Sequence, residues 1–406
     1  MSRPDALGGV PGDRVDGVIV GGHVLSPDGT IVEGVVAWSG SDLIEVVPGT
    51  DPAALSADVV IDAAGALVMP GLVDLHGDAF ERSVMPRPNV AMPVDLALAE
   101  NDHALAAAGI TTSYLSATDS WEPGLRSRAM LRELIAAIAR RTAGVDVRLH
   151  VRHEQCNTDD LDELVEWLDD GTVTFLSFND HAPKTTAAAS AMADSLTVLA
   201  RTGVDRDVLA GMAERAVGRR PVGERQTAAL RETALHAGVP TASHDTSNDD
   251  ELAGALALKL DIAEFPATLD LARAFREAGV GVMYGAPNLV RGGSHLGLVS
   301  ARSAVAAGVV DMLVSDYHYP SLLQAPFVLA DEGVVELAEA WALVSSTPAR
   351  LAGLHDRGRL EAGARADVVV VDPPADDRPA SVRAVLAGGR VVHRAHGAMA
   401  TRQVAR

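Results

Sequence analysis

The chain has 406 residues and a formal net charge of −21 at pH 7, from 55 acidic and 34 basic residues. This charge argues against nucleic acid or an anionic membrane as a partner, and it makes any anionic substrate depend on locally placed Arg and Lys. Hydrophobic residues make up 48% of the chain and aromatic residues only 3%, a composition that favours an α/β fold with a core of Ala, Val and Leu.

The length suits a large α/β barrel with a smaller accessory domain. The single cysteine, Cys156, excludes an intrachain disulfide and suits a reducing compartment. Residues 1–17 contain no apolar core of a signal peptide, and no segment offers the roughly 18 unbroken apolar residues of a membrane span. We therefore expect a cytoplasmic protein without a membrane partner, and a homodimer is left open.

Short apolar segments separated by Gly, Asp and Pro begin the chain, from Val15 to Ile61, and predict small antiparallel strands. The same pattern returns from Ala366 to Arg394, where residues 388–390 (GGR) are a hairpin turn signal. We expect residues 1–67 and 356–406 to form one β-sandwich domain together.

Between these ends, residues 68–355 alternate Ala-rich helical patterns with short apolar runs. Six runs begin apolar and end in His, Asp, Glu or Asn: GLVDLHGD, VRLHVRHE, VTFLSFNDH, VPTASHD, VGVMYGAPN and DMLVSDYH. The C-terminal strand ends of a parallel barrel meet at one mouth, so the pattern predicts a TIM-like (β/α)8 barrel with its site there. Residues 184–237 exceed one crossover helix and predict a helical insertion or lid.

His76 and Asp78 lie two positions apart on the first of these strands, so their side chains leave the same face. An imidazole nitrogen and a carboxylate suit a divalent ion such as Zn²⁺ or Mn²⁺. Taken alone, the pair is better explained by a hydrogen-bonded structural His. The recurrence of similar residues at other strand ends favours a metal centre over polar side chains that merely fill the barrel mouth. Potential ligands recur at Glu154, His181, His244 and Asp316.

Roles can be assigned to some of these ligands from their chemistry. Glu154 could bridge two ions, and His181 and His244 could each supply a nitrogen. Asp316 could bind metal and accept a proton from water, which makes it the predicted catalytic residue. We expect one or two divalent ions, with Zn first and Mn or Fe as alternatives.

Cationic residues lie in or just after the same strand ends, and Arg offers a fork geometry for phosphate oxygens. Two glycines before His295 allow a ligand to approach the backbone closely. Each residue alone is about equally well explained as a solvated or structural group. The predicted substrate-binding residues are Arg82, Arg87, Arg152, Lys184, Arg291 and His295.

These motifs together resemble those of the amidohydrolase superfamily and, within it, of the diphosphatase family that acts on alpha-D-ribose 1-methylphosphonate 5-triphosphate. PGLVDLHGD is similar to the superfamily's first-strand metal motif, with Asp78 where most members have a second His. ER, PRP, LHVRHE, DHAP, ASHD, AEFPATLDLA, GAPNLVRGGSHLG and SDYHYPSLLQA follow in that family's order. The resemblance covers most of the chain and implies a binuclear-type metal barrel that hydrolyses a nucleotide-like 5-triphosphate at the α-phosphorus, releasing diphosphate.

Two positions depart from that family's motifs. Lys184 lies in APKTTAAAS, where the family runs Pro-Gly-Gln-x-Gln after Asp180-His181, and Thr246 in SHDTSN replaces a second Asp. We expect Lys184 to supply a point charge to a phosphate-rich, small-molecule anionic substrate.

Two other functions compete with the phosphoanhydride hydrolase. Hydrolysis of a C–N bond, as in a deaminase or cyclic amidase, uses the same fold, but a small neutral amide needs fewer arginines at the mouth than a triphosphate does. The third possible function is that of a binding protein that kept the barrel and lost catalytic activity. The presence of all six predicted metal ligands argues against it.

Overall fold

The computed structural model describes residues 14–48, 56–142, 144–293 and 299–395. The chain divides into two compact units, one made of Met1–Gly71 with Asp356–Arg406 and the other of Leu72–His355. No helix among the described residues is long and apolar enough to cross a membrane.

Eight parallel strands form a barrel in the larger unit, each hydrogen-bonded to the next along the chain. A backbone bridge between Gly77 and Asp316 connects the end of the last strand to the first, because Asp316 N donates to His76 O at 2.8 Å and Asp78 N donates to Asp316 O at 3.0 Å. The predicted (β/α)8 fold class is confirmed. The strands are β6 (Leu72–Gly77), β7 (Ile110–Asp119), β8 (Asp146–Glu154), β9 (Phe175–Asn179), β10 (Thr241–His244), β11 (Ile262–Glu264), β12 (Gly281–Gly285) and β13 (Met312–Val314).

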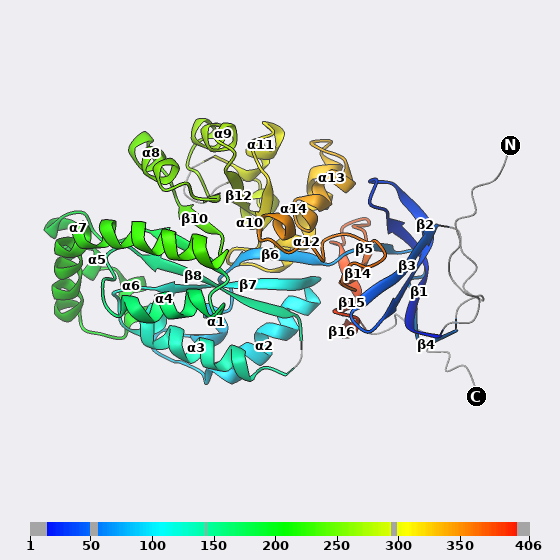
Figure 1. The fold of residues 1–406 in the computed structure, drawn as a ribbon, viewed down its shortest axis with the longest axis horizontal. Helices are drawn as coiled ribbons and strands as arrows, with labels where there is room; N and C mark the ends of the chain where they lie inside the picture. The colour runs from blue at the N-terminus through cyan, green and yellow to red at the C-terminus, as the bar shows by residue number, and fades with distance from the viewer. Residues whose placement is uncertain (1–13, 49–55, 143, 294–298, 396–406) are drawn as a thin grey trace. The chain divides into compact units, whose positions relative to one another are not determined.

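Helices cover these strands from outside, so strands such as β7 are buried along their whole length. Helix starts are well marked, since Ser127, Asn248 and Thr268 each accept a backbone N–H in the first turn of α3, α8 and α9. Figure 1 shows α8, α9 and α11 outside β10 and β12. The helices are α1 (Glu81–Val84), α2 (Val94–Ala107), α3 (Arg128–Arg140), α4 (Leu161–Asp169), α8 (Asp249–Ala257), α9 (Leu269–Glu277), α10 (Ala286–Val290), α11 (Ala301–Ala306), α12 (Pro320–Asp331), α13 (Leu337–Ala342) and α14 (Ser346–Leu351).

Three helices, rather than one, connect β9 to β10: α5 (Thr186–Ala193), α6 (Leu196–Thr202) and α7 (Arg206–Ala237), which Figure 1 shows together. They are anchored to the loops that follow β7 and β8. Arg201 of α6 forms a bidentate ion pair with Glu122 at 2.7 and 2.8 Å. Gly223 of α7 packs so closely that a Cβ there would lie 1.9 Å from Gln155 O. The insertion is therefore held firmly at the barrel mouth.

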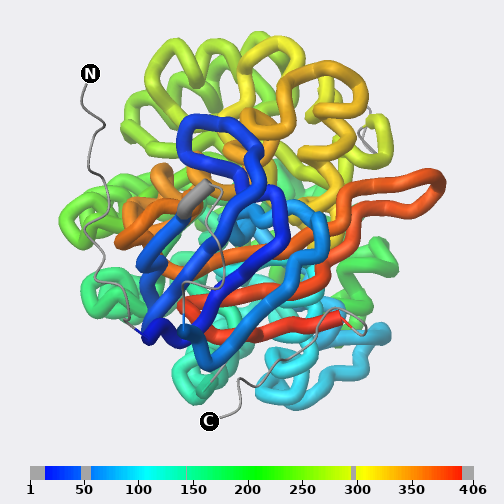
Figure 2. Tube along the Cα trace, turned by 90° about the vertical axis from the view of Figure 1, so that its right-hand side faces the viewer, coloured from blue at the N-terminus to red at the C-terminus, as the bar shows by residue number. Residues whose placement is uncertain are grey.

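The smaller unit is a sheet built from both chain ends, as the sequence predicted, but it is mixed rather than wholly antiparallel, because β1 pairs parallel with β4 and β5. β5 pairs antiparallel with β14 and parallel with β1, so strands from the two ends lie side by side in Figure 2. The predicted hairpin turn joins β15 to β16, with φ of +54° and +73° at Gly388 and Gly389. The strands are β1 (Arg14–Leu25), β2 (Ile31–Ser39), β3 (Asp42–Pro48), β4 (Ser56–Asp62), β5 (Leu67–Pro70), β14 (Val368–Asp372), β15 (Ser381–Ala387) and β16 (Arg390–Arg394).

Candidate metal centre

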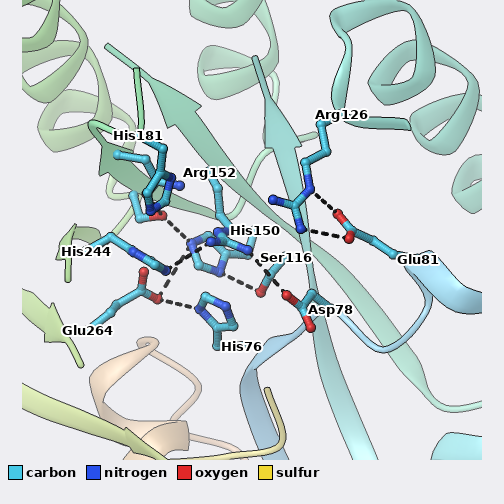
Figure 3. Close-up of polar contacts among 12 residues, drawn as sticks. His76, Asp78, Glu81, Ser116, Arg126, His150, Arg152, His181, His244 and Glu264 are labelled. Carbon is cyan, nitrogen blue, oxygen red and sulfur yellow. Dashed lines mark hydrogen bonds and ion pairs between the residues drawn. The ribbon is translucent and has the colours of Figure 1, made fainter. Parts of the chain in front are cut away.

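Polar side chains on or just after the barrel strands converge at the mouth (Figure 3). The backbone turns sharply just after β10, β11 and β13, where Asp245, Phe265 and Asp316 have φ of +54°, +54° and +52°. A left-handed conformation costs a residue with a side chain about 1–3 kcal/mol, and such strain gathers at functional sites. The strained turns aim the adjacent side chains into one place.

His76, Asp78 and Asp316 form the first group, with one potential ligand atom from each lying within 4.8 Å of the others. His76 Nδ1 is 2.9 Å from Glu264 Oε1, and because a carboxylate accepts, Nδ1 carries the proton and Nε2 the free lone pair. Burial, and then the positive charge of Arg152, lower the pKa of His76 well below its ordinary value. The imidazole is therefore neutral, the form that binds a metal ion.

Glu264 provides a test of whether a cation fits this site. It is 0% exposed, ends β11, and can join His76 and His244 as a ligand set. Its Oε2 atom has no hydrogen-bond partner among the described residues. An unpaired buried carboxylate oxygen is costly, and a divalent ion held by imidazoles and carboxylates would satisfy it. The residues present fit a metal ion.

His181, His244 and Asp245 form the second group of potential ligands. His181 Nδ1 donates to Glu154 Oε1 at 2.7 Å, so Glu154 lies beside this group. Although burial opposes it, hydrogen bonds to Asp245 and Glu154 raise the pKa of His181 to about 9. These carboxylates thus stabilise a positive charge here, and a metal ion can take the place of the proton.

Arg152 lies between the two groups in Figure 3. Its Nη1 donates to Asp78 Oδ2 at 3.4 Å and its Nη2 to His244 Nε2 at 3.0 Å, and its side chain is only 7% exposed. Since Arg cannot accept a hydrogen bond, His244 Nε2 holds a lone pair directed at the guanidinium. An ion that binds this nitrogen must displace the guanidinium from it.

Asp316 is a potential metal ligand whose pKa lies close to neutral pH. Burial, followed by the negative charge of Asp78, raises the pKa of Asp316 to about 7. The preceding residue, Ser315, donates its N–H and hydroxyl to Asp74 at 2.9 and 2.6 Å, which fixes the turn that carries Asp316. A carboxylate with a pKa near the working pH suits proton transfer.

His150 is on the same strand face as Glu154 and has its Nε2 3.8 Å from Glu264 Oε1, but hydroxyl groups occupy both of its ring nitrogens. Ser116 Oγ and Ser177 Oγ each lie 2.9 Å from one of them, and Phe175 stacks 4.2 Å away. It is a buried structural residue beneath the centre.

The predicted cations are not all in one place. Arg82 donates to the Tyr317 carbonyl and Arg291 to the Tyr317 hydroxyl at 3.3 Å. Arg87 is exposed in a turn with Val90, and Lys184 is 66% exposed with its Nζ 3.6 Å from Glu251. His295 lies outside the described residues.

Sequence reasoning missed Glu264, Asp245 and the pair formed by Arg126 and Glu81. Glu264 follows apolar residues in DIAEF, as the predicted ligands follow the apolar runs of their strands. It was missed because β11 has only three residues. Asp245 directly follows a predicted ligand. Arg126 donates to both Glu81 oxygens at 3.0 and 2.9 Å and comes from a loop where no strand pattern points to it.

Comparisons with known proteins agree with this geometry. Residues 96–393 match the amidohydrolase family. The chain is 34% identical over 328 residues to alpha-D-ribose 1-methylphosphonate 5-triphosphate diphosphatase of Escherichia coli (strain K12), covering 76% of this chain and 84% of that protein.

Solved structures share the fold at low sequence identity. A prolidase complexed with N-methylphosphonate-L-proline aligns with a TM-score of 0.60 and 18% identity, over 93% of this chain and 100% of that one. L-hydantoinase from Arthrobacter aurescens aligns with a TM-score of 0.55 and 16% identity, over 94% of this chain and 96% of that one. Ochratoxinase of A. niger aligns with a TM-score of 0.58 and 15% identity, over 95% of this chain and 97% of that one.

Proposed function

Since the chain belongs to the amidohydrolase family, we propose that this hydrolase cleaves a phosphoanhydride of a ribose 5-triphosphate-type phosphonate ester and releases diphosphate. The observation that carries the proposal is Arg152, whose guanidinium reaches between Asp78 and His244 in the ligand cluster. A guanidinium at this position can pair with phosphoryl oxygens, whereas a neutral amide has no need of it. The similarity to the Escherichia coli diphosphatase supports the same substrate class.

The proposed ion is Zn²⁺, with Mn²⁺ or Fe²⁺ as alternatives, and one or two are held by His76, Asp78, Glu154, His181, His244 and Asp316. Such an ion supplies charge to polarise a phosphoryl oxygen and to acidify a water molecule. Glu264 also belongs to this set, either as a ligand or as the group that orients His76. We also propose a cytoplasmic location, which suits the buried free thiol of Cys156.

Asp316 accepts the proton of the attacking water, because its carboxylate lies in the ligand cluster beside His76 and Asp78. The water oxygen bonds to the α-phosphorus while the bond from this phosphorus to the β-bridging oxygen breaks. Diphosphate leaves with the electron pair, and a 5-phosphate remains. Arg152 neutralises charge on the phosphoryl oxygens during this step.

The test is product analysis with purified, metal-supplemented enzyme. Attack at the α-phosphorus releases diphosphate, whereas attack at the terminal phosphorus releases orthophosphate, so ³¹P NMR of the products separates the two. Arg152→Leu should lower kcat/KM by about 10²-fold or more, as loss of a group that stabilises transition-state charge does. The exposed Arg140→Leu variant is the control. Ammonia release from amides or cyclic amides, with no diphosphate from the triphosphate, would instead establish the C–N hydrolase.

A further inference from the structure

A cavity of about 350 Å³ opens beside His181 and His244. It lies among the ends of β9 and β10, the start of the insertion, α7 and α8, and its volume is within the range of about 300–1,000 Å³ for small-molecule sites. Figure 3 shows Arg126 and Glu81 on the opposite side of the ligand cluster from His181. The cavity is therefore at the end of the centre remote from Arg126.

The barrel order separates the arginines from this cavity. Arg82 follows β6, Arg126 follows β7 and Arg291 follows β12, and the bridge between Gly77 and Asp316 makes β12, β13, β6 and β7 one continuous arc. The cavity belongs to β9 and β10 across the barrel. Arg152 of β8 lies between the two regions.

The charge of the cavity does not suit a triphosphate. Among the described lining residues Lys184 is the single Lys or Arg, whereas Asp180, Asp245 and Glu251 are carboxylates. Lys184 Nζ is 3.6 Å from Glu251 Oε1, so its charge is already offset. The other cations beside the cavity also have carboxylate partners, since Arg220 pairs with Asp180 and His181 pairs with Glu154 and Asp245. A polyanion placed here would therefore find no free positive charge among the described residues.

The same lining suits a group with many hydroxyls. Carboxylates accept hydrogen bonds from hydroxyls, and Thr227 and Ser243 offer hydroxyls of their own. Asn179 is 1% exposed, and its Nδ2 atom has no hydrogen-bond partner among the described residues. Phe178 and Leu258 add apolar surface, against which the C–H face of a sugar ring can pack.

We propose that this cavity binds the sugar portion of the substrate, while Arg82 and Arg291 of the β12–β7 arc, whose partners are the uncharged oxygens of Tyr317, bind the leaving diphosphate. This inference rests on the proposed function and adds the direction in which the substrate lies. The C5 oxygen leads from the cavity to the α-phosphorus at the ligand cluster, and the β- and γ-phosphates extend past Arg152. Both departures from the family's motifs, Lys184 and Thr246, line the cavity, so they act on the sugar end.

Gly254 of α8 offers a steric test, because it lines the cavity and a Cβ there would meet nothing within 4 Å. Gly254→Leu fills the space without a backbone clash, and leucine is a better helix former than glycine. Ala253→Leu on the same helix is the control, since Ala253 is exposed and outside the cavity lining. The substrates are D-ribose 5-triphosphate and methyl triphosphate, which lacks the sugar.

Gly254→Leu should lower kcat/KM for ribose triphosphate at least tenfold more than for methyl triphosphate, and Ala253→Leu should alter neither by more than twofold. Equal losses on both substrates, or no loss, would overturn the sugar assignment. If the wild-type enzyme released diphosphate from neither of these nor from the phosphonate ester, the proposed function would fail by itself. Calorimetry with D-ribose 5-phosphate then decides: binding weakened at least tenfold by Gly254→Leu supports the cavity, and unchanged or absent binding overturns it.

Discussion

His76 Nδ1 donates to Glu264 Oε1 at 2.9 Å across the barrel, although the two residues are 188 positions apart in the chain. Both side chains are essentially buried, at 1% and 0% exposed. The contact holds the imidazole with its Nε2 lone pair available, and the other Glu264 oxygen has no hydrogen-bond partner among the described residues. The orientation of His76 on β6 therefore depends on Glu264 of β11.

Glu264→Gln should weaken metal binding by about 10–100-fold, the usual effect of removing a group that orients a metal-ligating His. The amide can present its nitrogen to His76 and leaves the site one negative charge short. Affinity can be measured by competition with a chromophoric chelator. Glu163→Gln on α4, which alters an ion pair with Arg132 of α3, is the control. Equal affinities in the two variants would show that Glu264 does not serve the metal.

Removal of metal should abolish hydrolysis and lower thermal stability. We expect one or two divalent ions per chain by elemental analysis after mild purification. A ligand at 100 times its dissociation constant stabilises the native state by about 2.7 kcal/mol, so chelation should lower the Tm and added Zn²⁺ should restore it. Full activity in metal-free protein would contradict the prediction.

Asp316→Asn should reduce kcat by about 10²–10⁴-fold, the usual worth of a general base. The side chain keeps its size, so the circular dichroism spectrum should remain native. Asp331→Asn, at an exposed position at the end of α12, should keep full activity. A near-native kcat for Asp316→Asn would place the proton acceptor elsewhere.

Asp119→Asn should destabilise the barrel by about 3 kcal/mol, because the buried Arg128 would lose its bidentate carboxylate and keep only the longer 3.4 Å ion pair with Glu163. Asp119 accepts from Arg128 Nε and Nη2, both at 2.6 Å, and from His153 Nδ1 at 2.7 Å. Urea unfolding can measure the loss. Asp95→Asn, whose partner Arg140 is exposed, should change the free energy of unfolding by no more than about 1 kcal/mol.

Asp119 should also make the free energy of unfolding depend on pH. Although burial opposes it, hydrogen bonds from His153 and Arg128 hold the pKa of Asp119 below its ordinary value. The native state therefore binds this proton less readily than the unfolded chain, so the stabilisation is complete above about pH 5 and is lost as the pH falls through the native pKa. The difference in stability between wild type and Asp119→Asn should shrink in acid. A constant difference down to pH 3 would contradict this account.

Gly223→Ala and Gly218→Ala, both on α7, should have opposite effects. A Cβ at Gly223 would lie 1.9 Å from Gln155 O, whereas a Cβ at Gly218 meets nothing within 4 Å. The first variant should lose about 1–3 kcal/mol of unfolding free energy through overpacking. The second should gain up to about 1 kcal/mol, because alanine is the better helix former. Similar effects would mean that α7 is not fixed against the end of β8.

The sequence alone determined the barrel, and it predicted the mouth as the site and the candidate ligand residues. Parallel strands buried on both faces need apolar runs, so a run that ends in His76 or Asp316 marks both a strand and the place where it stops. The pattern failed for Glu264, because β11 is only three residues long and too short to show a run. The sequence also predicted one sheet domain from both chain ends, because local strand and turn signals are enough to identify small strands.

Only the tertiary structure decided which polar groups meet. Barrel closure sets Asp316 beside His76 and joins the strands that carry Arg82, Arg126 and Arg291 into one arc, whereas Lys184 lies with Glu251 across the barrel. From the sequence these cations looked equivalent, because each simply follows a strand. Their separation depends on the circular order of strands and on hydrogen bonds between residues far apart in the chain, which no local pattern records.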